Sequence, residues 1–312
     1  MKRCLFCYQA LEQGEPDFHI KCSKKIFGTP IVPELNFHEN ELDALEDQIV
    51  KTYTAVTGVQ PKFSLDLRKF PDHQRERFTI VGLWGGYILK PPSITYEQLP
   101  EIEDLTMHLA SIANINVVPH SLIRLLSGNL AYITKRIDRK KNHKLPMEDM
   151  CQITERQSEH KYNGSYEQIA KAIIKYSKTP ILDVVNFYEI VLFSFLTGNS
   201  DMHLKNFSLI TQSNSGPVLS PAYDLVATKI IFKEDEEMAL TLNARKNKIM
   251  KSDFEAAFQK SNLDLNQQKN IFNKMIKVKN IWLDFIDISF LNKEYKQIYK
   301  SIITERFDRL FL

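Results

Sequence analysis

Hydrophobic and polar positions alternate along several short stretches in the first half of the chain. Phe63, Leu65 and Leu67 take every second position between 62 and 67, which predicts a strand with one buried face. Turn residues Ser127-Gly128-Asn129 separate two further apolar runs, which predicts a hairpin. Strands are expected at 62–67, 77–81, 86–89, 122–126 and 130–137.

Apolar residues recur at helical spacing in the second half of the chain. Residues 181–196 are apolar on most faces, as expected of a central buried helix. Helices are expected at 35–53, from Pro100 to about Ala113, from 146–152 onward, at 166–176 and in several pieces over 252–312. Strands are expected at 207–211, 218–219 and 238–242. The pattern predicts an α+β chain, with strands mainly before residue 140 and helices mainly after it.

Composition restricts the classes of function. The chain has 312 residues, 43% of them apolar, which suits two lobes or one domain with a small module. The net charge of +3 results from 41 basic and 38 acidic residues, so bulk charge gives no reason to expect nucleic acid or a membrane as the main partner. Cys4 follows Met1-Lys2-Arg3 without an apolar signal region, and we expect a cytoplasmic protein with no membrane span.

Cysteine and histidine are concentrated near the N-terminus. The spacing is Cys4-x2-Cys7 followed by His19-x2-Cys22, with Gly14 between the two pairs. Three thiolates and one imidazole in two close pairs are typical of a zinc knuckle. The alternative is three free cysteines and a surface histidine in a short leading segment.

A polar loop is predicted between the helix at 181–196 and the strand at 207–211. It contains Asp201, Lys205 and Asn206 within six residues. In a phosphoryl-transfer enzyme a carboxylate orients and deprotonates the attacking hydroxyl, a lysine neutralises the moving phosphoryl group, and an amide binds Mg²⁺. Asp224 follows the next predicted hairpin and could complete a magnesium site with Asn206. Alternatively, Asp and Asn only cap a helix-to-strand connection.

A second group of candidate residues lies in the strand-rich half. Lys90 ends a buried apolar strand, where it requires an anionic partner. The following helix offers Glu101 and Glu103, and Glu103 is preferred because apolar residues follow it into the packed face. A lysine at an edge that reaches solvent is the alternative. The loop around Gly58 and Lys62 could cover a triphosphate, although an ordinary hairpin has the same pattern.

Five stretches of the chain together resemble the HipA-like serine/threonine kinases, the toxins of bacterial toxin–antitoxin modules. The resemblance extends from about Thr52 to the C-terminus. The stretches are Gly58-Val59-Gln60-Pro61-Lys62, Ile88-Leu89-Lys90-Pro91, Glu148-Asp149-Met150-Cys151-Gln152, Asn199-Ser200-Asp201-Met202-His203-Leu204-Lys205-Asn206 and Tyr223-Asp224-Leu225.

The resemblance implies a two-lobed protein-kinase-like fold that uses ATP and Mg²⁺. We expect an N-terminal segment at 1–50, a β-rich N-lobe at 51–139 and a helical C-lobe at 140–312. It also implies that Asp201 is the catalytic base and that Asn206 and Asp224 bind Mg²⁺. Lys90 is similar to the phosphate-binding lysine. The remaining nucleotide contacts that it implies are Thr57, Gly58, Val59, Gln60, Lys62, Lys135, Arg136, Ile137, Gln152, His203 and Lys205.

The chain departs from the family pattern in three places. The segment Lys135-Arg136-Ile137 is the expected hinge, where backbone groups of Arg136 and Ile137 would meet the adenine edge, and it stands where the family usually has Glu-Arg-Phe. Ala55 stands at the position of a regulatory serine, so we expect Thr54, or Thr57 instead, to be autophosphorylated and to compete with ATP phosphates. About fifty residues precede the loop, whereas full-length HipA toxins carry an extra N-terminal subdomain of roughly a hundred residues, so the chain resembles the shorter HipT-type kinases.

The resemblance also suggests partners. These are an aminoacyl-tRNA synthetase as substrate, a helix-turn-helix antitoxin through which DNA is contacted indirectly, and a small protein in place of the missing subdomain. Two alternative functions remain open at this point: a small-molecule or lipid kinase of related fold, and a nucleotide-binding pseudokinase.

Overall fold

The computed structural model describes residues 2–42, 44–45, 61–69, 75–82, 84–140, 143–212, 216–232 and 236–312. Their contacts divide the chain into two compact units. Unit 1 comprises Met1–Asp104 and Val118–Ile137, and unit 2 comprises Leu105–Val117 and Asp138–Leu312. The chain therefore leaves unit 1 for the last time after Ile137, within the segment where a hinge is expected.

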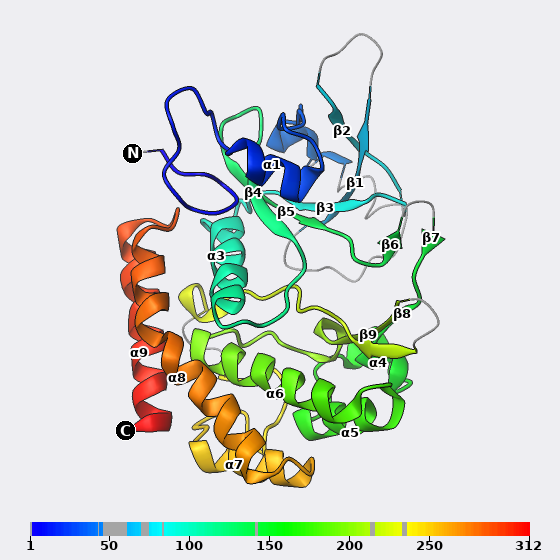
Figure 1. Cartoon of the computed structure of the whole chain (residues 1–312), viewed down its shortest axis with the longest axis vertical. Helices are drawn as coiled ribbons and strands as arrows, with labels where there is room; N and C mark the ends of the chain where they lie inside the picture. Colours follow the sequence, from blue (N-terminus) through cyan, green and yellow to red (C-terminus); the bar gives the residue numbers. More distant parts are fainter. Residues whose placement is uncertain are drawn as a thin grey trace. The chain divides into compact units, whose positions relative to one another are not determined.

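Unit 1 contains a five-stranded antiparallel sheet with the strand order β2-β1-β3-β5-β4 (Figure 1). Phe63 and Leu65 of β1 are buried and Leu67 is partly buried, in keeping with the predicted alternation, and the hairpin between β4 and β5 is confirmed. The strands are β1 (Phe63–Arg68), β2 (Arg77–Ile80), β3 (Tyr87–Lys90), β4 (His120–Arg124) and β5 (Leu130–Lys135).

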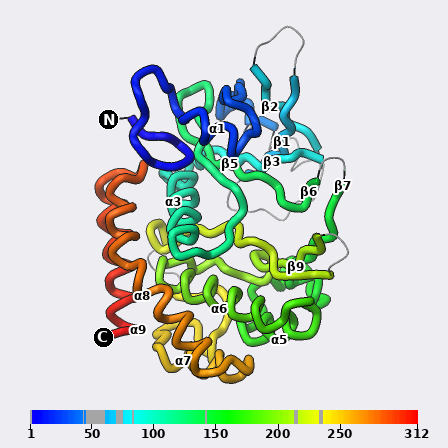
Figure 2. The backbone as a smooth tube through the Cα atoms, in the orientation of Figure 1, coloured from blue at the N-terminus to red at the C-terminus, as the bar shows by residue number. Residues whose placement is uncertain are grey.

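Helix α1 (Ile20–Phe27) packs on this sheet (Figure 2). The sequence pattern did not predict this helix. The ring of Phe27 contacts Phe78 edge to face, with centroids 5.8 Å apart, and Tyr87 donates a hydrogen bond from its hydroxyl to Ile26 O. The helix ends at Gly28, whose φ of 82° is the left-handed conformation that glycine adopts readily. The N-terminal segment is thus an integral part of unit 1.

Helix α3 (Leu99–Ile112) follows β3 and continues from unit 1 into unit 2, close to the predicted range of 100–113. Its first turn contains Glu101, which is partly buried. Burial and the neighbouring carboxylates of Asp104 and Glu97 raise the pKa of Glu101 to about 7. The first turn of α3 therefore holds a carboxyl group that titrates near neutral pH.

The stability of the protein is expected to fall as pH rises from 5 to 8 because of Glu101. The folded pKa of about 7 lies above the unfolded value of 4.5, so the folded state binds the proton more tightly and loses that advantage as pH rises through 7. We expect the contribution to be roughly 2 kcal/mol. Urea unfolding of Glu101→Gln should show a weaker decline over this range than the wild type. Glu294→Gln, at an exposed first-turn position of another helix, should leave the decline unchanged, and a decline unaffected by Glu101→Gln would contradict the prediction.

Unit 2 is mainly helical around the buried helix α6 (Pro180–Thr197). This helix is long and apolar enough to cross a membrane, but 72% of it is buried inside the structure, as expected of a core helix. The other helices are α4 (Met150–Ile153), α5 (Tyr166–Tyr176), α7 (Lys251–Lys260), α8 (Leu265–Asp287) and α9 (Lys293–Phe311). Figure 1 shows α8 and α9 side by side.

The strands of unit 2 are short. β8 (Met147–Asp149), β9 (Ser208–Thr211) and β10 (Pro217–Leu219) form a three-stranded sheet in the order β10-β9-β8, while β6 (Arg139–Lys140) pairs with β7 (His143–Lys144). The hairpin of β9 and β10 was predicted from the sequence. Because β9 and β10 are antiparallel, the residues before β9 and the residues after β10 lie at the same end of this small sheet.

Two predicted elements in unit 2 are wrong. Residues 147–149 form β8 rather than the start of a helix, because Asp149 caps α4 in a capping box and the helix begins only at Met150. Residues 238–242 form no strand: Thr241 makes an isolated bridge to Ser165, and Asn243 has a φ of 48° that turns the chain. The apolar side chains of this stretch are buried in the protein interior without forming a strand. They are Met238, Ala239, Leu240 and Leu242. Short apolar runs of this kind do not distinguish strands from other buried segments.

The predicted helix at 35–53 and the predicted phosphate-binding loop fall largely outside the described residues. Residues 39–42 and 44–45 are helical. Thr54, Ala55, Thr57, Gly58, Val59 and Gln60 are not among the described residues.

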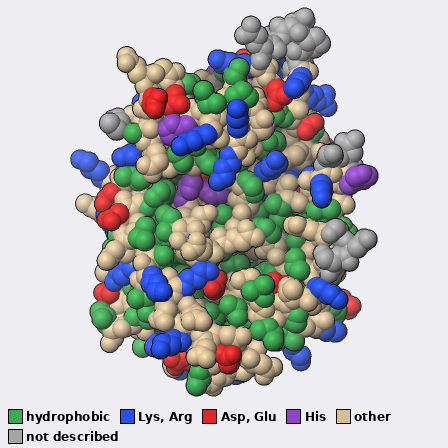
Figure 3. All heavy atoms as spheres, in the orientation of Figure 1, with side chains coloured by type: hydrophobic (Ala, Val, Ile, Leu, Met, Phe, Trp, Pro, Cys, Tyr) green, Lys and Arg blue, Asp and Glu red, His purple; other side chains and the backbone are tan. Residues whose placement is uncertain are grey.

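On the face drawn in Figure 3, basic and acidic side chains are interspersed, in keeping with the small net charge.

Candidate functional site

The polar loop after α6 begins at Gly198. This glycine has a φ of 73°, and a Cβ atom there would lie 2.9 Å from Ile302 Cγ2 and 3.0 Å from Lys229 Cβ. A larger residue would therefore clash as well as be strained. Ser200 donates its backbone N–H to Thr228 Oγ1 at 2.9 Å. The start of the loop is thus held in one position against the helical core of unit 2.

Internal hydrogen bonds fix the shape of the loop around Asp201. Asn199 Oδ1 accepts the backbone N–H of Asp201 at 3.2 Å, and the backbone N–H of His203 donates to Asp201 O at 2.8 Å. Asn206 donates from Nδ2 to the same carbonyl at 3.0 Å. Because this nitrogen is used, the remaining side-chain group of Asn206 is Oδ1, an acceptor. The loop therefore presents a carboxylate and an amide oxygen five residues apart.

Asp201 has a partner that the sequence analysis did not predict. The hydroxyl of Tyr162 donates to Asp201 Oδ1 at 2.6 Å, and its ring lies edge to face on His203 with centroids 5.1 Å apart. Tyr162 is 41% exposed. It lies in a polar connection far from the loop in sequence, and no periodicity or motif marks it.

Asp224 lies just after β10 and is tied to the loop through its neighbour. The hydroxyl of Tyr223 donates to Lys205 O at 2.9 Å and lies 2.6 Å from Ser208 Oγ. Asp224 itself has a φ of 60°, in the left-handed region that few residues other than glycine adopt. Such backbone conformations cluster at functional sites. The second predicted carboxylate is therefore anchored to the same loop as Asp201 and Asn206.

His203 belongs to the same loop and is buried, with an exposed fraction of 6%. Burial lowers its pKa, while the charges of Asp201 and Asp224 act in the opposite direction. Both carboxylates therefore act on one imidazole, and burial outweighs them and holds its pKa below the usual value. Among the described residues, Nδ1 of His203 has no hydrogen-bond partner. A buried polar atom without a partner is costly, and a ligand that satisfies it would be favoured here.

Two other residues that were predicted to contact the nucleotide, Lys205 and Gln152, form contacts with other residues of the protein. Lys205 forms an ion pair with Asp149, with Nζ 2.7 Å from Oδ2. Asp149 also caps α4, where Gln152 Oε1 accepts the backbone N–H of Asp149 at 2.9 Å. Lys205 therefore joins the loop to the start of α4, and the nucleotide contacts of Lys205 and Gln152 stay predictions.

Lys90 and Glu103 form a buried ion pair in unit 1. Lys90 Nζ lies 2.6 and 2.7 Å from the two carboxylate oxygens of Glu103. The side chains are only 6% and 1% exposed, respectively. The structure thus pairs Lys90 with Glu103, the glutamate preferred over Glu101 in the sequence analysis. A lysine ammonium held at the end of β3 by a carboxylate is the arrangement that binds nucleotide phosphates in kinases.

The predicted hinge differs from expectation in one respect. The backbone N–H of Arg136 donates to Gly86 O at 2.9 Å, so this group is already used within unit 1. An adenine edge would then meet carbonyl oxygens of the hinge or the N–H of Ile137. Lys62 lies just before β1, and both Lys62 and Lys135 are exposed. Their contacts with nucleotide stay predictions.

Comparison with known proteins is consistent with this geometry. Residues 54–282 match the model of the HipA-like C-terminal domain. A Haemophilus influenzae protein named "Putative kinase" is 30% identical over 207 residues, which is 62% of this chain and 58% of that protein. The Shewanella oneidensis serine/threonine-protein kinase toxin HipA is 25% identical over 217 residues, 62% of this chain and 47% of the toxin.

The fold also matches a solved structure. The HipA chain in the Shewanella oneidensis complex of HipA, HipB and operator DNA superposes with a TM-score of 0.69 at 20% identity, covering 90% of this chain and 73% of that one. The fold is therefore protein-kinase-like. The chain spans about half the length of the curated relatives that it matches. Because the family model matches most of the sequence, the chain belongs to the HipA-like C-terminal domain family.

Proposed function

We propose that this protein is an ATP-dependent serine/threonine protein kinase. The observation that carries the proposal is the anchored loop that presents Asp201 and Asn206, with Asp224 tied to it by the bonds of Tyr223. A base, a metal-binding amide and a metal-binding carboxylate are what phosphoryl transfer requires from this part of a kinase.

The oxygen donors of Asn206 and Asp224 fit Mg²⁺, which prefers carboxylate and carbonyl oxygens. Magnesium bound there would neutralise charge on the phosphates of ATP. Asn206 is suited to this because its Nδ2 is held by Asp201 O, which leaves its Oδ1 as the acceptor. Asp224 is suited because its left-handed backbone sets the direction of the carboxylate.

The remaining residues act on the substrate and the nucleotide. Asp201 accepts the proton of the substrate hydroxyl as the oxygen attacks the γ-phosphorus, and the bond from this phosphorus to the β–γ bridging oxygen breaks, so that ADP leaves with the electron pair. Lys90, held by Glu103, binds the phosphates and keeps them in position for attack. His203, whose Nδ1 has no partner among the described residues, contributes a hydrogen bond to the bound nucleotide.

The family resemblance extends the proposal to a biological role. We assign this chain as a growth-inhibiting toxin of the HipT type in the cytoplasm. Its substrate is a translation component such as an aminoacyl-tRNA synthetase. Its partner is a helix-turn-helix antitoxin, through which DNA is contacted. The Shewanella HipA structure, solved with HipB and operator DNA, supports the antitoxin partner.

Incubation with γ-labelled ATP and a cell lysate tests the activity. We expect label on serine or threonine of a protein, identified by mass spectrometry, and at least about a hundredfold less label with the Asp201→Asn variant. Label in the lipid or small-molecule fraction would favour the alternative function, a small-molecule or lipid kinase of related fold. ATP binding without any transfer would favour a pseudokinase.

Autophosphorylation is tested separately, by intact mass and peptide mapping of the purified protein after incubation with ATP. We expect one phosphate on Thr54, with Thr57 as the alternative site. A dianion there would compete with the phosphates of ATP for the same donors. Absence of phosphate from residues 52–57 would refute this part of the proposal.

Tyr162 is expected to position Asp201 during transfer. Tyr162→Phe removes the 2.6 Å hydrogen bond to Oδ1, and hydrogen bonds to charged groups contribute about 1.5–3 kcal/mol. We expect kcat to fall by about tenfold and ATP affinity, measured by calorimetry, to stay the same. Tyr176→Phe, at a similarly exposed tyrosine in unit 2, is the control. An unchanged or higher kcat would mean that the hydroxyl only blocks the carboxylate.

A further inference from the structure

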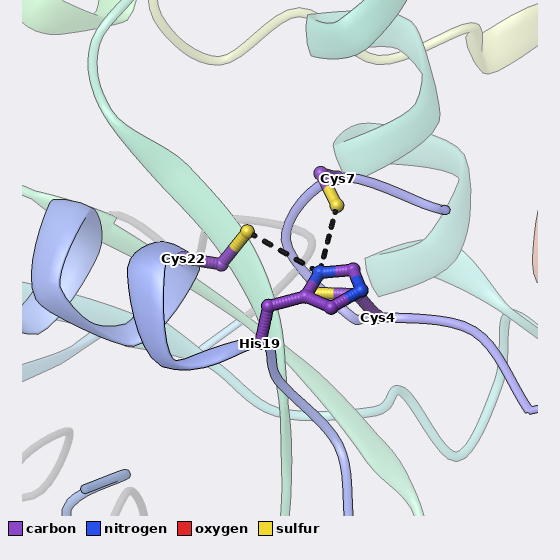
Figure 4. Close-up of side chains that lie close together, drawn as sticks. All are labelled: Cys4, Cys7, His19 and Cys22. Atoms are coloured by element: carbon purple, nitrogen blue, oxygen red, sulfur yellow. Dashed lines mark hydrogen bonds between the residues drawn. The ribbon is translucent and has the colours of Figure 1, made fainter. Parts of the chain in front are cut away.

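Four side chains converge at the N-terminus of unit 1 in a way that the kinase mechanism does not use. Figure 4 shows Cys4, Cys7, His19 and Cys22 facing one another from two short segments. Their ligand atoms all lie within 4.8 Å of one another. Cys4 and Cys22 are buried, and Cys7 and His19 are partly buried. The two sequence pairs therefore meet as one cluster in the folded chain.

Local structure explains why each pair is preorganised. Cys4 and Cys7 lie on a tight loop closed by hydrogen bonds from Tyr8 N–H to Cys4 O and from Cys4 N–H to Gln9 O, both 2.9 Å. His19 is the N-cap of α1, and Cys22 lies in the first turn, where its N–H donates to His19 O at 2.9 Å. Residues three apart at a helix start lie on the same face. Both pairs are thus aimed by backbone geometry.

The separations fit a tetrahedral zinc ion. His19 Nδ1 lies 3.4 Å from Cys7 Sγ and 3.6 Å from Cys22 Sγ. Zinc bonds of about 2.3 Å to sulfur and about 2.0–2.1 Å to nitrogen at tetrahedral angles place sulfur and nitrogen about 3.6 Å apart. The cluster therefore has the dimensions of a mononuclear site.

The second nitrogen of His19 determines which ring atom faces the sulfurs. Nε2 lies 2.9 Å from Ala10 O, and a carbonyl only accepts, so Nε2 carries a hydrogen. In the neutral ring Nδ1 then carries a lone pair, and it is directed at the two thiols. Glu15 Oε2 lies 3.8 Å from the same nitrogen. Metal-bound histidines are typically fixed in this way, with the other nitrogen donating to a backbone carbonyl or carboxylate.

We propose that Cys4, Cys7, His19 and Cys22 bind one structural Zn²⁺ ion. Three thiolates and an imidazole are soft ligands that favour zinc over the hard cations used with ATP. Four protein ligands complete the tetrahedron and leave no position for a substrate, which is the property of a structural site. The ion fastens the N-terminal segment onto the sheet of unit 1.

Contacts of the same segment show what the ion secures. Within the first ligand pair, Leu5 O accepts the backbone N–H of Leu122 in β4 at 3.3 Å. Between the two pairs, Asp17 forms an ion pair at 2.8 Å with Arg124 of the same strand. Next to Cys7, the buried hydroxyl of Tyr8 donates to Asp104 Oδ2 at 2.8 Å. Asp104 follows Glu103 in α3. The zinc site thus supports the turn of α3 that holds Lys90, a consequence that rests on the proposed kinase function.

Metal analysis of the full chain tests the zinc site without reference to kinase activity. We expect one zinc ion per chain in protein purified under reducing conditions without added metal. Cys7→Ser and His19→Ala should each lose most of it, whereas Cys151→Ala, at a buried cysteine in unit 2, should retain it. Absence of zinc from the wild type, zinc retained by both ligand variants, or stoichiometric iron in its place would overturn the proposal.

A second measurement covers the case in which the ligand variants do not fold. Wild-type protein produced with Co²⁺ should show the visible bands of a tetrahedral cobalt–thiolate centre, and a mercurial thiol reagent should release one zinc ion and lower the melting temperature. Octahedral cobalt spectra, or zinc release without a change in melting temperature, would refute a structural thiolate site. If zinc is present and no phosphoryl transfer is found, the zinc site stands and the kinase proposal fails.

Discussion

Asp201→Asn is expected to lower the rate of phosphoryl transfer by about 10²–10⁴-fold, the range typical for loss of general base catalysis. The substitution keeps the size of the side chain and the backbone bonds of the loop, including Asn206 Nδ2 to Asp201 O. It removes the charged acceptor for the substrate proton. The dissociation constant of ATP should therefore stay nearly unchanged. Single-turnover transfer measured beside equilibrium ATP binding separates the two effects.

The control for this experiment is Asp284→Asn, the same chemical change at an exposed position on α8. It should alter neither transfer nor ATP binding. Loss of ATP binding together with transfer in the Asp201 variant would mean that Asp201 acts on the nucleotide rather than as a base. Transfer at the wild-type rate would remove Asp201 from the mechanism.

Elements with strong local patterns could be predicted from the sequence. Alternation marked β1, the Ser127-Gly128-Asn129 turn marked the β4–β5 hairpin, and the apolar run marked α6. Prediction failed where pairing with a distant strand competed with the local hydrophobic pattern. The pairing of β8 with β9 is made by a partner about sixty residues away, and it overrode the helical pattern that starts at Pro146.

The candidate site was predictable as far as it depends on spacing along one segment. The spacing of Asp201 and Asn206 is set by the loop itself, and the two Cys and His pairs are each local. Tyr162 and Asp149 could not be found in this way, because they reach Asp201 and Lys205 across 39 and 56 residues of sequence. Such contacts depend on packing of the whole unit, which leaves no local pattern.

Lys90→Met is expected to destabilise the protein by about 3–5 kcal/mol, the cost of leaving a buried charge without its partner. Glu103 is 1% exposed and both of its oxygens accept from Lys90 Nζ. The double variant Lys90→Met, Glu103→Leu should recover most of this loss, since replacing a whole buried pair by apolar residues is often neutral or better. Free energies of unfolding from urea denaturation of the wild type, both single variants and the double variant measure the coupling.

An exposed ion pair provides the matched control. Lys300 and Asp287 lie at the same 2.6 Å separation, with side chains 30% and 61% exposed, so Lys300→Met should cost at most about 1 kcal/mol. A similarly small cost for Lys90→Met would mean that water reaches the Lys90–Glu103 pair.

The double variant also separates stability from catalysis. Methionine at 90 cannot bind phosphate, so the refolded double variant should remain inactive in transfer although its stability is restored. Full transfer activity in a stable double variant would assign the pair a purely structural role. The ammonium of Lys90 would then have no part in binding ATP, and the phosphates would have to be held by groups of the loop that contains Gly58 and Lys62.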